Sequence, residues 1–234
     1  MKQGDLLFLY TKKIILKYND AAMDQLIFVL EMIGTAAFAF SGALVALKNR
    51  MDVFGVVVLG VITATGGGVL RDLVLGVVPP AAFQNPVYVM SAAVVSLLVF
   101  LYVYVHARKG SEFSSHLFTM MLLWMDSAGL AIFTGMGVTS AANLYGLDNG
   151  FLLVFAGVIT GVGGGLLRDV IVRSLPDIFT KHIYAIASIV GALVMVLIMR
   201  AGFPSIALWT GCALILLIRL SAAHFRWSLP RVQE

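Results

Sequence analysis

The sequence predicts an all-α integral membrane protein whose seven transmembrane helices form two inverted three-helix repeats followed by a seventh helix. Of its 234 residues, 60% are hydrophobic and only 12% are charged, whereas soluble domains carry about 25% charged residues. The apolar residues lie in runs that are long enough to cross a bilayer core about 30 Å thick. In addition, a motif of three glycines followed by an Arg-Asp pair occurs twice along the chain.

Seven apolar runs follow a mixed segment at the N-terminus. They cover residues 26–47, 54–78, 86–105, 116–136, 151–173, 182–199 and 203–221. Every backbone group in the hydrocarbon core needs a partner inside the protein, so each run is predicted to be an α-helix. The predicted organisation is a first repeat over residues 26–106, a second repeat over 116–199, a seventh helix over 203–221 and a C-terminal tail over 222–234.

The N-terminal segment, residues 1–25, mixes Lys12, Lys13 and Lys17 with aliphatic and aromatic residues. It shows no small-residue cleavage site behind a compact apolar core, so no signal peptide is predicted. Its composition fits an amphipathic segment that lies at the membrane interface. A disordered tail is the alternative.

The second and fifth apolar runs repeat each other. Residues 60–80 read GVITATGGGVLRDLVLGVVPP, and residues 157–177 read GVITGVGGGLLRDVIVRSLPD. At a separation of 97 residues, 11 of the 21 aligned positions are identical, which is far more than chance gives. The runs before them match more loosely and align Phe38 with Phe133. Runs one to three and runs four to six are therefore predicted to be internal repeats.

The number of helices in a repeat sets the topology. Three helices is an odd number, so the second copy must enter the membrane from the opposite face, as in many secondary transporters. Eight Lys and Arg residues lie on the side of the C-terminus and five on the other side. The positive-inside rule therefore predicts a cytoplasmic C-terminus.

Each repeat places three consecutive glycines near the middle of an apolar run. These residues are Gly66, Gly67, Gly68, Gly163, Gly164 and Gly165. A glycine inside a helix costs about 1 kcal/mol relative to alanine, so the second and fifth helices are predicted to break at the triplets. Freed backbone groups are tolerated in a membrane where they line a wet cavity, and paired broken helices are typical of ion or substrate sites. The alternative is close packing of helices through small residues spaced by four.

An Arg-Asp pair follows each triplet within about one turn: Arg71 with Asp72, and Arg168 with Asp169. Charges inside a membrane are costly and usually face the bundle interior or water. Pairing across the repeats, Arg71 with Asp169 and Arg168 with Asp72, fits the predicted pseudo-two-fold symmetry. Two roles stay open, a charged gate beside a permeation path and a structural ion pair that clamps the helix break.

Four further polar residues occupy equivalent places in the two repeats. Thr63 and Thr160 stand three residues before the triplets, where their hydroxyls either face the path or bond back to their own helix. Glu31 and Asp126 stand early in the first and fourth runs. They either lie at the membrane interface or attract cations at a vestibule.

Several classes of function are excluded by the remaining residues. The basic residues cluster between apolar runs, as in cytoplasmic loops, so no nucleic-acid partner is expected. The four histidines and the single Cys212 show no ligand spacing, which predicts no resident metal ion and no cofactor. The segment 161–165 lacks both the third glycine of a dinucleotide motif and a Walker lysine. No catalytic constellation is present, so an enzyme is not expected.

The doubled GGG-x-L-R-D motif and the stretch Gly34-Thr-x-x-Phe38-Ala-x-Ser41-Gly42 resemble the prokaryotic branch of the trimeric intracellular cation channel family. Members of this family have also carried the labels of an uncharacterised membrane family and of a "glycine transporter" domain. The resemblance covers about residues 25–220. It implies a homotrimer in a bacterial plasma membrane, with one pore inside each subunit that conducts monovalent cations, K⁺ foremost and Na⁺ as a second candidate.

The same resemblance implies roles for particular residues. The two glycine triplets would bend the pore helices, and Arg71 and Arg168 would lie beside the path. Animal members bind an acidic phosphoinositide through basic residues near these breaks, so membrane lipids are expected partners, with Arg71 and Arg168 at similar positions.

Three functions are compatible with the predicted architecture. A passive channel for monovalent cations is the leading hypothesis. A secondary transporter of a small solute such as glycine is the alternative, because an inverted pair of broken helices serves both classes. A membrane scaffold or lipid-binding protein without transport is the third.

Overall fold

The computed structural model describes residues 3–108, 115–180, 183–225 and 227, and it describes only the backbone of residues 3–24, 115 and 180. The described residues form helices and contain no strand. The helices are α1 (Gln3–Lys48), α2 (Val53–Val74), α3 (Ala81–Gln84), α4 (Val87–Arg108), α5 (Ser115–Tyr145), α6 (Gly150–Ile171), α7 (Asp177–Thr180), α8 (Tyr184–Arg200) and α9 (Pro204–His224).

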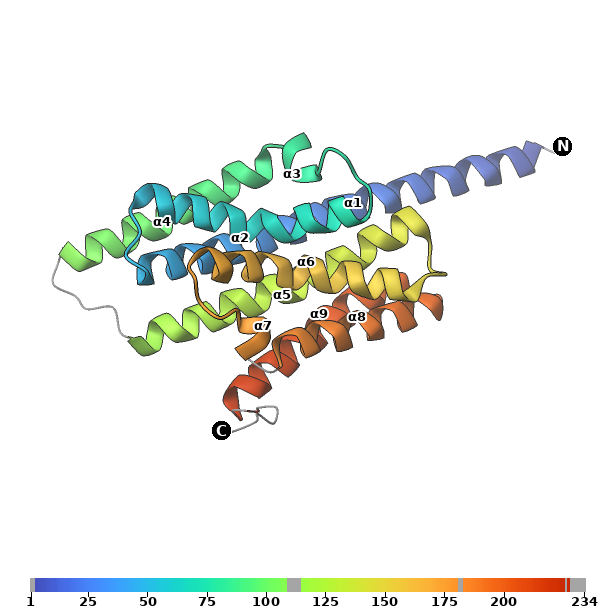
Figure 1. Ribbon diagram of the computed structural model, residues 1–234. Helices are drawn as coiled ribbons and strands as arrows, with labels where there is room; N and C mark the ends of the chain where they lie inside the picture. The colour runs from blue at the N-terminus through green and yellow to red at the C-terminus, as the bar shows by residue number, and fades with distance from the viewer. Residues whose placement is uncertain (1–2, 109–114, 181–182, 226, 228–234) are drawn as a thin grey trace.

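The long helices lie side by side, and the two ends of the chain lie at opposite ends of the bundle (Figure 1). Six of them are long and apolar enough to cross a membrane. The spans are Gln25–Lys48, Val53–Val74, Val87–Arg108, His116–Tyr145, Gly150–Ile171 and Pro204–His224. Helix α8 has 17 residues, about 25 Å at 1.5 Å per residue, and is the shorter seventh member. The predicted all-helical membrane fold is confirmed.

Helices α2 and α6 pack against each other at the centre of the bundle. Helix α1 packs on α2 and α5 packs on α6, and α1 also contacts α5. Helix α4 covers α1 and α2, while α8 covers α5 and α6 in the same way. The two halves therefore make equivalent contacts, and α9 packs on α5 and α8 without an equivalent on α1 and α4 among the described helices.

The helices that carry the Arg-Asp pairs end shortly after them. Helix α2 ends at Val74, where Gly76 adopts a left-handed φ of 72° and the N–H of Val77 bonds to the carbonyl of Asp72 at 2.8 Å. Helix α6 ends at Ile171, followed by Arg173 at a φ of 56°. Both ends are Schellman motifs, in which a left-handed residue lets the chain turn back onto the last carbonyls. The predicted helix ends at residues 78 and 173 were therefore too late.

Two other boundaries differ from the predicted ones. Helix α5 continues to Tyr145, although the fourth run was predicted to end at residue 136. The added length packs closely, because Gly137 lies against the Ala156 carbonyl of α6 and leaves no room for a Cβ atom. Helix α1 begins at Gln3, so the backbone of the N-terminal segment continues the first span. Its location at a membrane interface stays a prediction.

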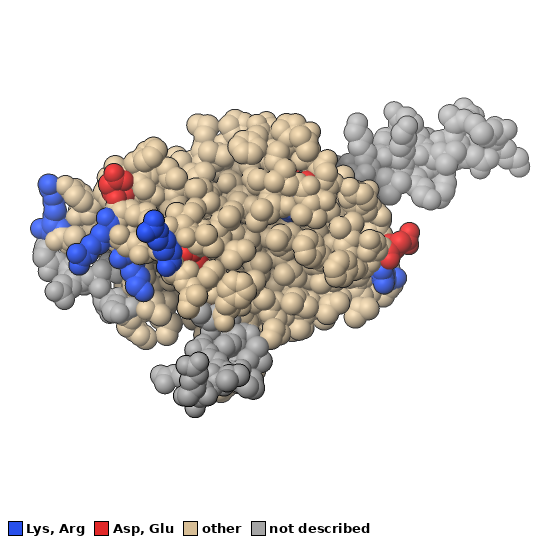
Figure 2. Space-filling view, in the orientation of Figure 1, with Lys and Arg blue, Asp and Glu red and all other residues tan. Residues whose placement is uncertain are grey.

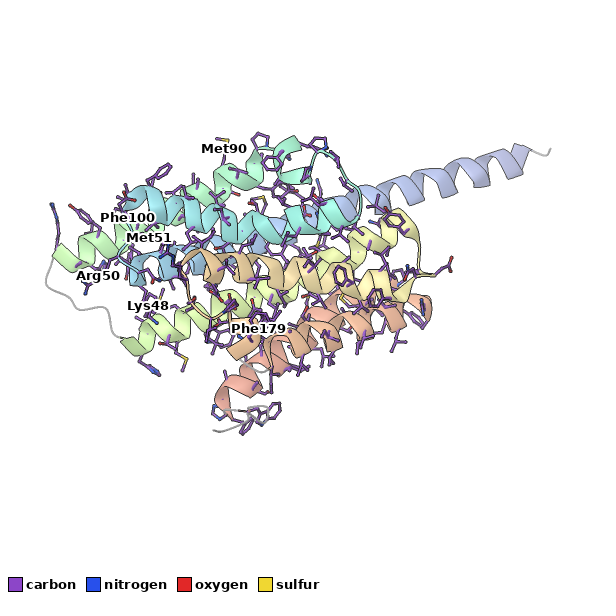
Figure 3. All side chains as sticks on the ribbon, in the orientation of Figure 1. Lys48, Arg50, Met51, Met90, Phe100 and Phe179 are labelled. Carbon is purple, nitrogen blue, oxygen red and sulfur yellow. The ribbon has the colours of Figure 1, made fainter. Side chains whose placement is uncertain are left out.

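The exposed charges lie at the two ends of the bundle. On the face shown in Figure 2, Lys and Arg gather at one end, and the surface between the ends carries almost no charge. The exposed basic residues of the described chain at that end are Lys48, Arg50, Arg108 and Arg173. Figure 3 shows Lys48 and Arg50 where α1 turns into α2. At the other end, the guanidinium of Arg200 bonds to the carbonyl of Leu147 at 2.7 Å.

Candidate functional site

The glycine triplets lie where α2 and α6 cross. Both helices run through their triplets without interruption, so the predicted break at these positions is wrong in this structure. A Cβ atom on Gly67 would overlap the carbonyl oxygen of Thr160, and one on Gly164 would overlap the carbonyl oxygen of Thr63. Close packing of the two backbones offsets the low helix propensity of glycine. The packing alternative therefore describes the triplets.

The two threonines at the crossing bond to their own helices. The hydroxyl of Thr63 donates to the carbonyl of Leu59 at 2.6 Å, and that of Thr160 donates to the carbonyl of Ala156 at 2.5 Å. Both residues are fully buried. Each threonine thus presents its carbonyl, rather than its hydroxyl, to the glycine of the opposite helix.

An aromatic pair lies beside the crossing. The ring centroids of Phe38 and Phe133 are 5.3 Å apart, and both residues are buried. A Cβ atom on Gly164 would lie 3.4 Å from the Phe38 ring, and one on Gly34 would lie 3.3 Å from the Phe133 ring. Sequence reasoning gave these rings no role, although their equivalent places in the two repeats were a signal that could have found them.

Each Arg-Asp pair closes within its own repeat, so the predicted pairing across the repeats is wrong. The Nε atom of Arg71 donates to Asp72 Oδ1 at 2.8 Å, and Arg168 Nε donates to Asp169 Oδ1 at 2.8 Å. Each arginine bonds to the aspartate that follows it, and the other oxygen of that aspartate is bonded within the same repeat. That oxygen accepts the N–H of Ala81 in α3 at 2.8 Å, or the N–H of Asp177 in α7 at 2.9 Å.

The cluster of the first repeat surrounds a cavity of about 50 Å³. Its lining includes Glu31, Thr65, Gly68, Arg71, Asp72 and Tyr88. Glu31 is half-buried and accepts a hydrogen bond of 2.5 Å from the Tyr88 hydroxyl. Glu31 therefore lines this small cavity with its carboxylate bonded to Tyr88.

The cluster of the second repeat is tightly closed. The Nη1 atom of Arg168 donates to Asp126 Oδ1 at 2.7 Å and to the Ser41 hydroxyl at 2.5 Å. A carboxylate oxygen of Asp177 lies 3.7 Å from Arg168 Nη2. Arg168 is only 1% exposed and Asp126 only 3%. One guanidinium thus joins α6 to α1, α5 and α7.

The cluster of the second repeat includes two residues that the sequence analysis did not single out. The guanidinium carbon of Arg219, on α9, lies 4.7 Å from the centre of the Tyr184 ring. Both residues are buried. Within the described part of the chain, Tyr184 Oη and Arg219 Nε have no hydrogen-bond partner. An arginine inside an apolar span is a signal that could have found Arg219.

Comparison with known proteins gives consistent results. The family model described as "Glycine transporter" matches residues 28–104 and again residues 123–200. An inner membrane protein of Escherichia coli, YadS, is 42% identical over 212 residues, which cover 88% of this chain and 96% of that protein. The trimeric intracellular cation channel orthologue of Rhodobacter sphaeroides superposes with a TM-score of 0.78 at 31% identity, covering 86% of this chain and 99% of that one.

A prokaryotic channel of the same kind, solved in 0.5 M KCl, also superposes with a TM-score of 0.78, at 29% identity over 88% of this chain and 99% of its own. The fold and the buried charged clusters define a multi-pass membrane protein of the channel and transporter class. The chain belongs to the trimeric intracellular cation channel family.

Proposed function

We propose that the protein is a passive channel for monovalent cations, K⁺ foremost, with a path inside each subunit that passes the crossing of α2 and α6. The observation that carries this proposal is the arrangement of two charged clusters on either side of that crossing. The cluster of Arg71 is bonded through Asp72 to Ala81 of α3, and the cluster of Arg168 is bonded through Asp169 to Asp177 of α7. The glycine triplets and the Phe38–Phe133 pair separate them.

The charges of the clusters favour cations. The first cluster contains Glu31 and Asp72 beside the single Arg71. In the second, Asp126, Asp169 and Asp177 outnumber Arg168 and Arg219 among the described residues. Each cluster therefore carries one surplus carboxylate, and rings or clusters of carboxylates raise the local concentration of cations. The cavity beside Glu31 would be the entrance, and the closed cluster around Arg168 would be the barrier.

Roles for the remaining site residues follow from the same proposal. The two glycine triplets, Gly66–Gly68 and Gly163–Gly165, would keep α2 and α6 in close contact. A small movement of one helix against the other could then open or close the path. The Arg-Asp pairs would clamp the ends of these helices to α3 and α7. In keeping with the trimeric neighbours, the active unit would be a homotrimer. The basic end of the bundle would face the cytoplasm of a bacterial cell and the anionic lipids of its inner membrane.

Secondary transport of a small solute such as glycine is the competing function. The observation in its favour is the open cavity on one side of a closed crossing, an asymmetry that alternating access also requires. The description of the matching family model names glycine. Counterflow of labelled glycine in proteoliposomes distinguishes this function from a channel.

The deciding experiment is K⁺ efflux from vesicles of phosphatidylethanolamine and phosphatidylglycerol that contain the purified protein, with planar-bilayer recordings beside it. A channel gives single-channel steps and a flux that rises linearly with the K⁺ gradient. Phe38→Leu, which opens space beside the crossing, is expected to change the unitary conductance, while Phe54→Leu, at an exposed position at the start of α2, leaves it unchanged. Saturable glycine counterflow without single-channel steps would contradict the channel and support the transporter.

A further inference from the structure

We propose that Tyr184 is a gating residue: when the barrier at the second cluster opens, the Tyr184 hydroxyl takes the Asp126 carboxylate over from Arg168. The inference rests on the proposed channel function and names the local exchange that would open it. The two halves of the molecule each hold a tyrosine, an arginine and a carboxylate, and the two sets have different arrangements.

In the first half, the tyrosine holds the carboxylate. The Tyr88 hydroxyl donates to Glu31 at 2.5 Å, while Arg71 lies back on Asp72 with an Nη2–Oδ1 distance of 2.8 Å. Within the described residues, no ion pair joins Arg71 to Glu31. The cavity of about 50 Å³ lies beside this arrangement. In the half with the cavity, the tyrosine is therefore bonded to Glu31, and the arginine is not.

In the second half, the arginine holds the carboxylate. Arg168 bonds to Asp126 at 2.7 Å. Tyr184, which like Tyr88 stands at the start of the third helix of its half, has a buried hydroxyl with no hydrogen-bond partner in the described chain. In the closed half the carboxylate is thus bonded to the arginine and not to the tyrosine, which is the opposite of the first half.

The last glycine of each triplet shows that Tyr184 fills, in the second half, the space that corresponds to the cavity of the first half. A Cβ atom on Gly68 would meet only Arg71 Nη2, at 4.0 Å, and Gly68 lines the cavity of the first half. A Cβ atom on the equivalent Gly165 would lie 3.1 Å from the Tyr184 hydroxyl and 3.7 Å from Arg168 Nη2. The hydroxyl and the guanidinium together fill the space that is open in the first half.

The charges around Tyr184 make the exchange physically reasonable. The hydroxyl and Arg168 Nη2 both lie within 4 Å of the Cβ position of Gly165, and Arg168 in turn is bonded to Asp126. A buried hydroxyl without a partner is unfavourable, so an acceptor offered by Asp126 offsets part of the cost of moving Arg168 away. Arg168 keeps its pair with Asp169 after it leaves, and Arg219 stays beside the ring as a second cation. Asp126 and Arg168 would thus each keep a partner in both states.

The test is single-channel recording of Tyr184→Phe beside wild type in the phospholipid bilayers described above. Removing the hydroxyl while keeping the ring is expected to lower the open probability at least about tenfold, the lower end of the range for one hydrogen bond to a charged group. The unitary conductance should not change, because the path itself is intact. Tyr104→Phe, on the exposed side of α4, is the matched control and should behave as wild type. An unchanged open probability in Tyr184→Phe would overturn the proposal.

A second measurement separates this proposal from the channel function on which it rests. In a Cys212→Ala background, Ser41→Cys places a thiol beside Arg168, and an impermeant cationic thiol reagent reports how often this site is open. Addition of Tyr184→Phe is expected to slow the labelling at least about tenfold, whether or not current is detected. Equal labelling rates would overturn the gating role, whereas an absence of current with slowed labelling would count against the channel alone.

Discussion

At the scale of the residue, the two arginines that follow the glycine triplets have unequal surroundings although their sequence contexts are nearly the same. Arg71 pairs with Asp72 and faces a cavity. Arg168 is surrounded by Asp126, Asp169 and Asp177 and also donates to Ser41. An arginine that neutralises several buried carboxylates is harder to replace than one with a single partner beside a cavity.

This difference predicts unequal losses of stability. Arg168→Gln is expected to destabilise the protein by about 3–5 kcal/mol, because it leaves buried carboxylates without their cation. Arg71→Gln is expected to cost less, because water in the cavity can solvate Asp72. Thermal unfolding of the purified variants in detergent would measure both. Equal losses for the two variants would show that the closed cluster contributes no extra stability.

At the scale of the element, the crossing of α2 and α6 depends on backbone contact. Gly67 and Gly164 each meet the carbonyl of a threonine in the opposite helix, so the helices approach more closely than side chains would allow. Gly68 has no such contact and lies beside the cavity. Adjacent glycines of one triplet thus have different functions in the fold.

The contrast between neighbouring glycines can be tested directly. Gly67→Ala is expected to destabilise the protein by about 1–3 kcal/mol, because the new methyl group overlaps the Thr160 carbonyl and forces the helices apart. Gly68→Ala is the matched control and is expected to be neutral or stabilising by up to about 1 kcal/mol, since alanine is the better helix former. Melting temperatures of both variants decide the point. A Gly67→Ala protein as stable as wild type would contradict the close crossing.

The sequence was informative about the helices and less so about their contacts. Hydrophobic runs predicted every long helix, and the doubled motif placed Arg71 and Arg168 inside the bundle. The break at the triplets was wrong because helix propensity is a local property, whereas the approach of the Thr160 carbonyl to Gly67 comes from a residue far along the chain. The partners of Arg168 and the role of Tyr184 were missed for the same reason, since neither follows from spacing.

At the scale of the whole molecule, the described charges are unequally distributed between the two ends. Lys48, Arg50, Arg108 and Arg173 are exposed at one end, whereas the described charges at the other include Arg200, which is bonded to loop carbonyls. The chain termini lie at opposite ends of the bundle (Figure 1). The positive-inside rule therefore predicts that the basic end faces the cytoplasm.

The orientation can be measured in intact cells. In a Cys212→Ala background, Asn49→Cys reports the basic end and Asp148→Cys reports the other end. An impermeant thiol reagent is expected to label Asp148→Cys from outside, and to label Asn49→Cys only after the cells are opened. The reverse pattern would place the basic end in the periplasm.

The reciprocal contact of glycine with threonine carbonyl also bears on how the two halves can change over evolutionary time. Gly67 is confined by the backbone of the second half, and Gly164 by the backbone of the first. A side chain gained at either position would push away the helix of the other repeat. After a duplication, this mutual constraint keeps the sequences of the two crossing segments similar, while the sequences of the outer helices diverge. The 11 identities in 21 positions around the triplets, beside the looser match elsewhere, are the pattern that this constraint would leave.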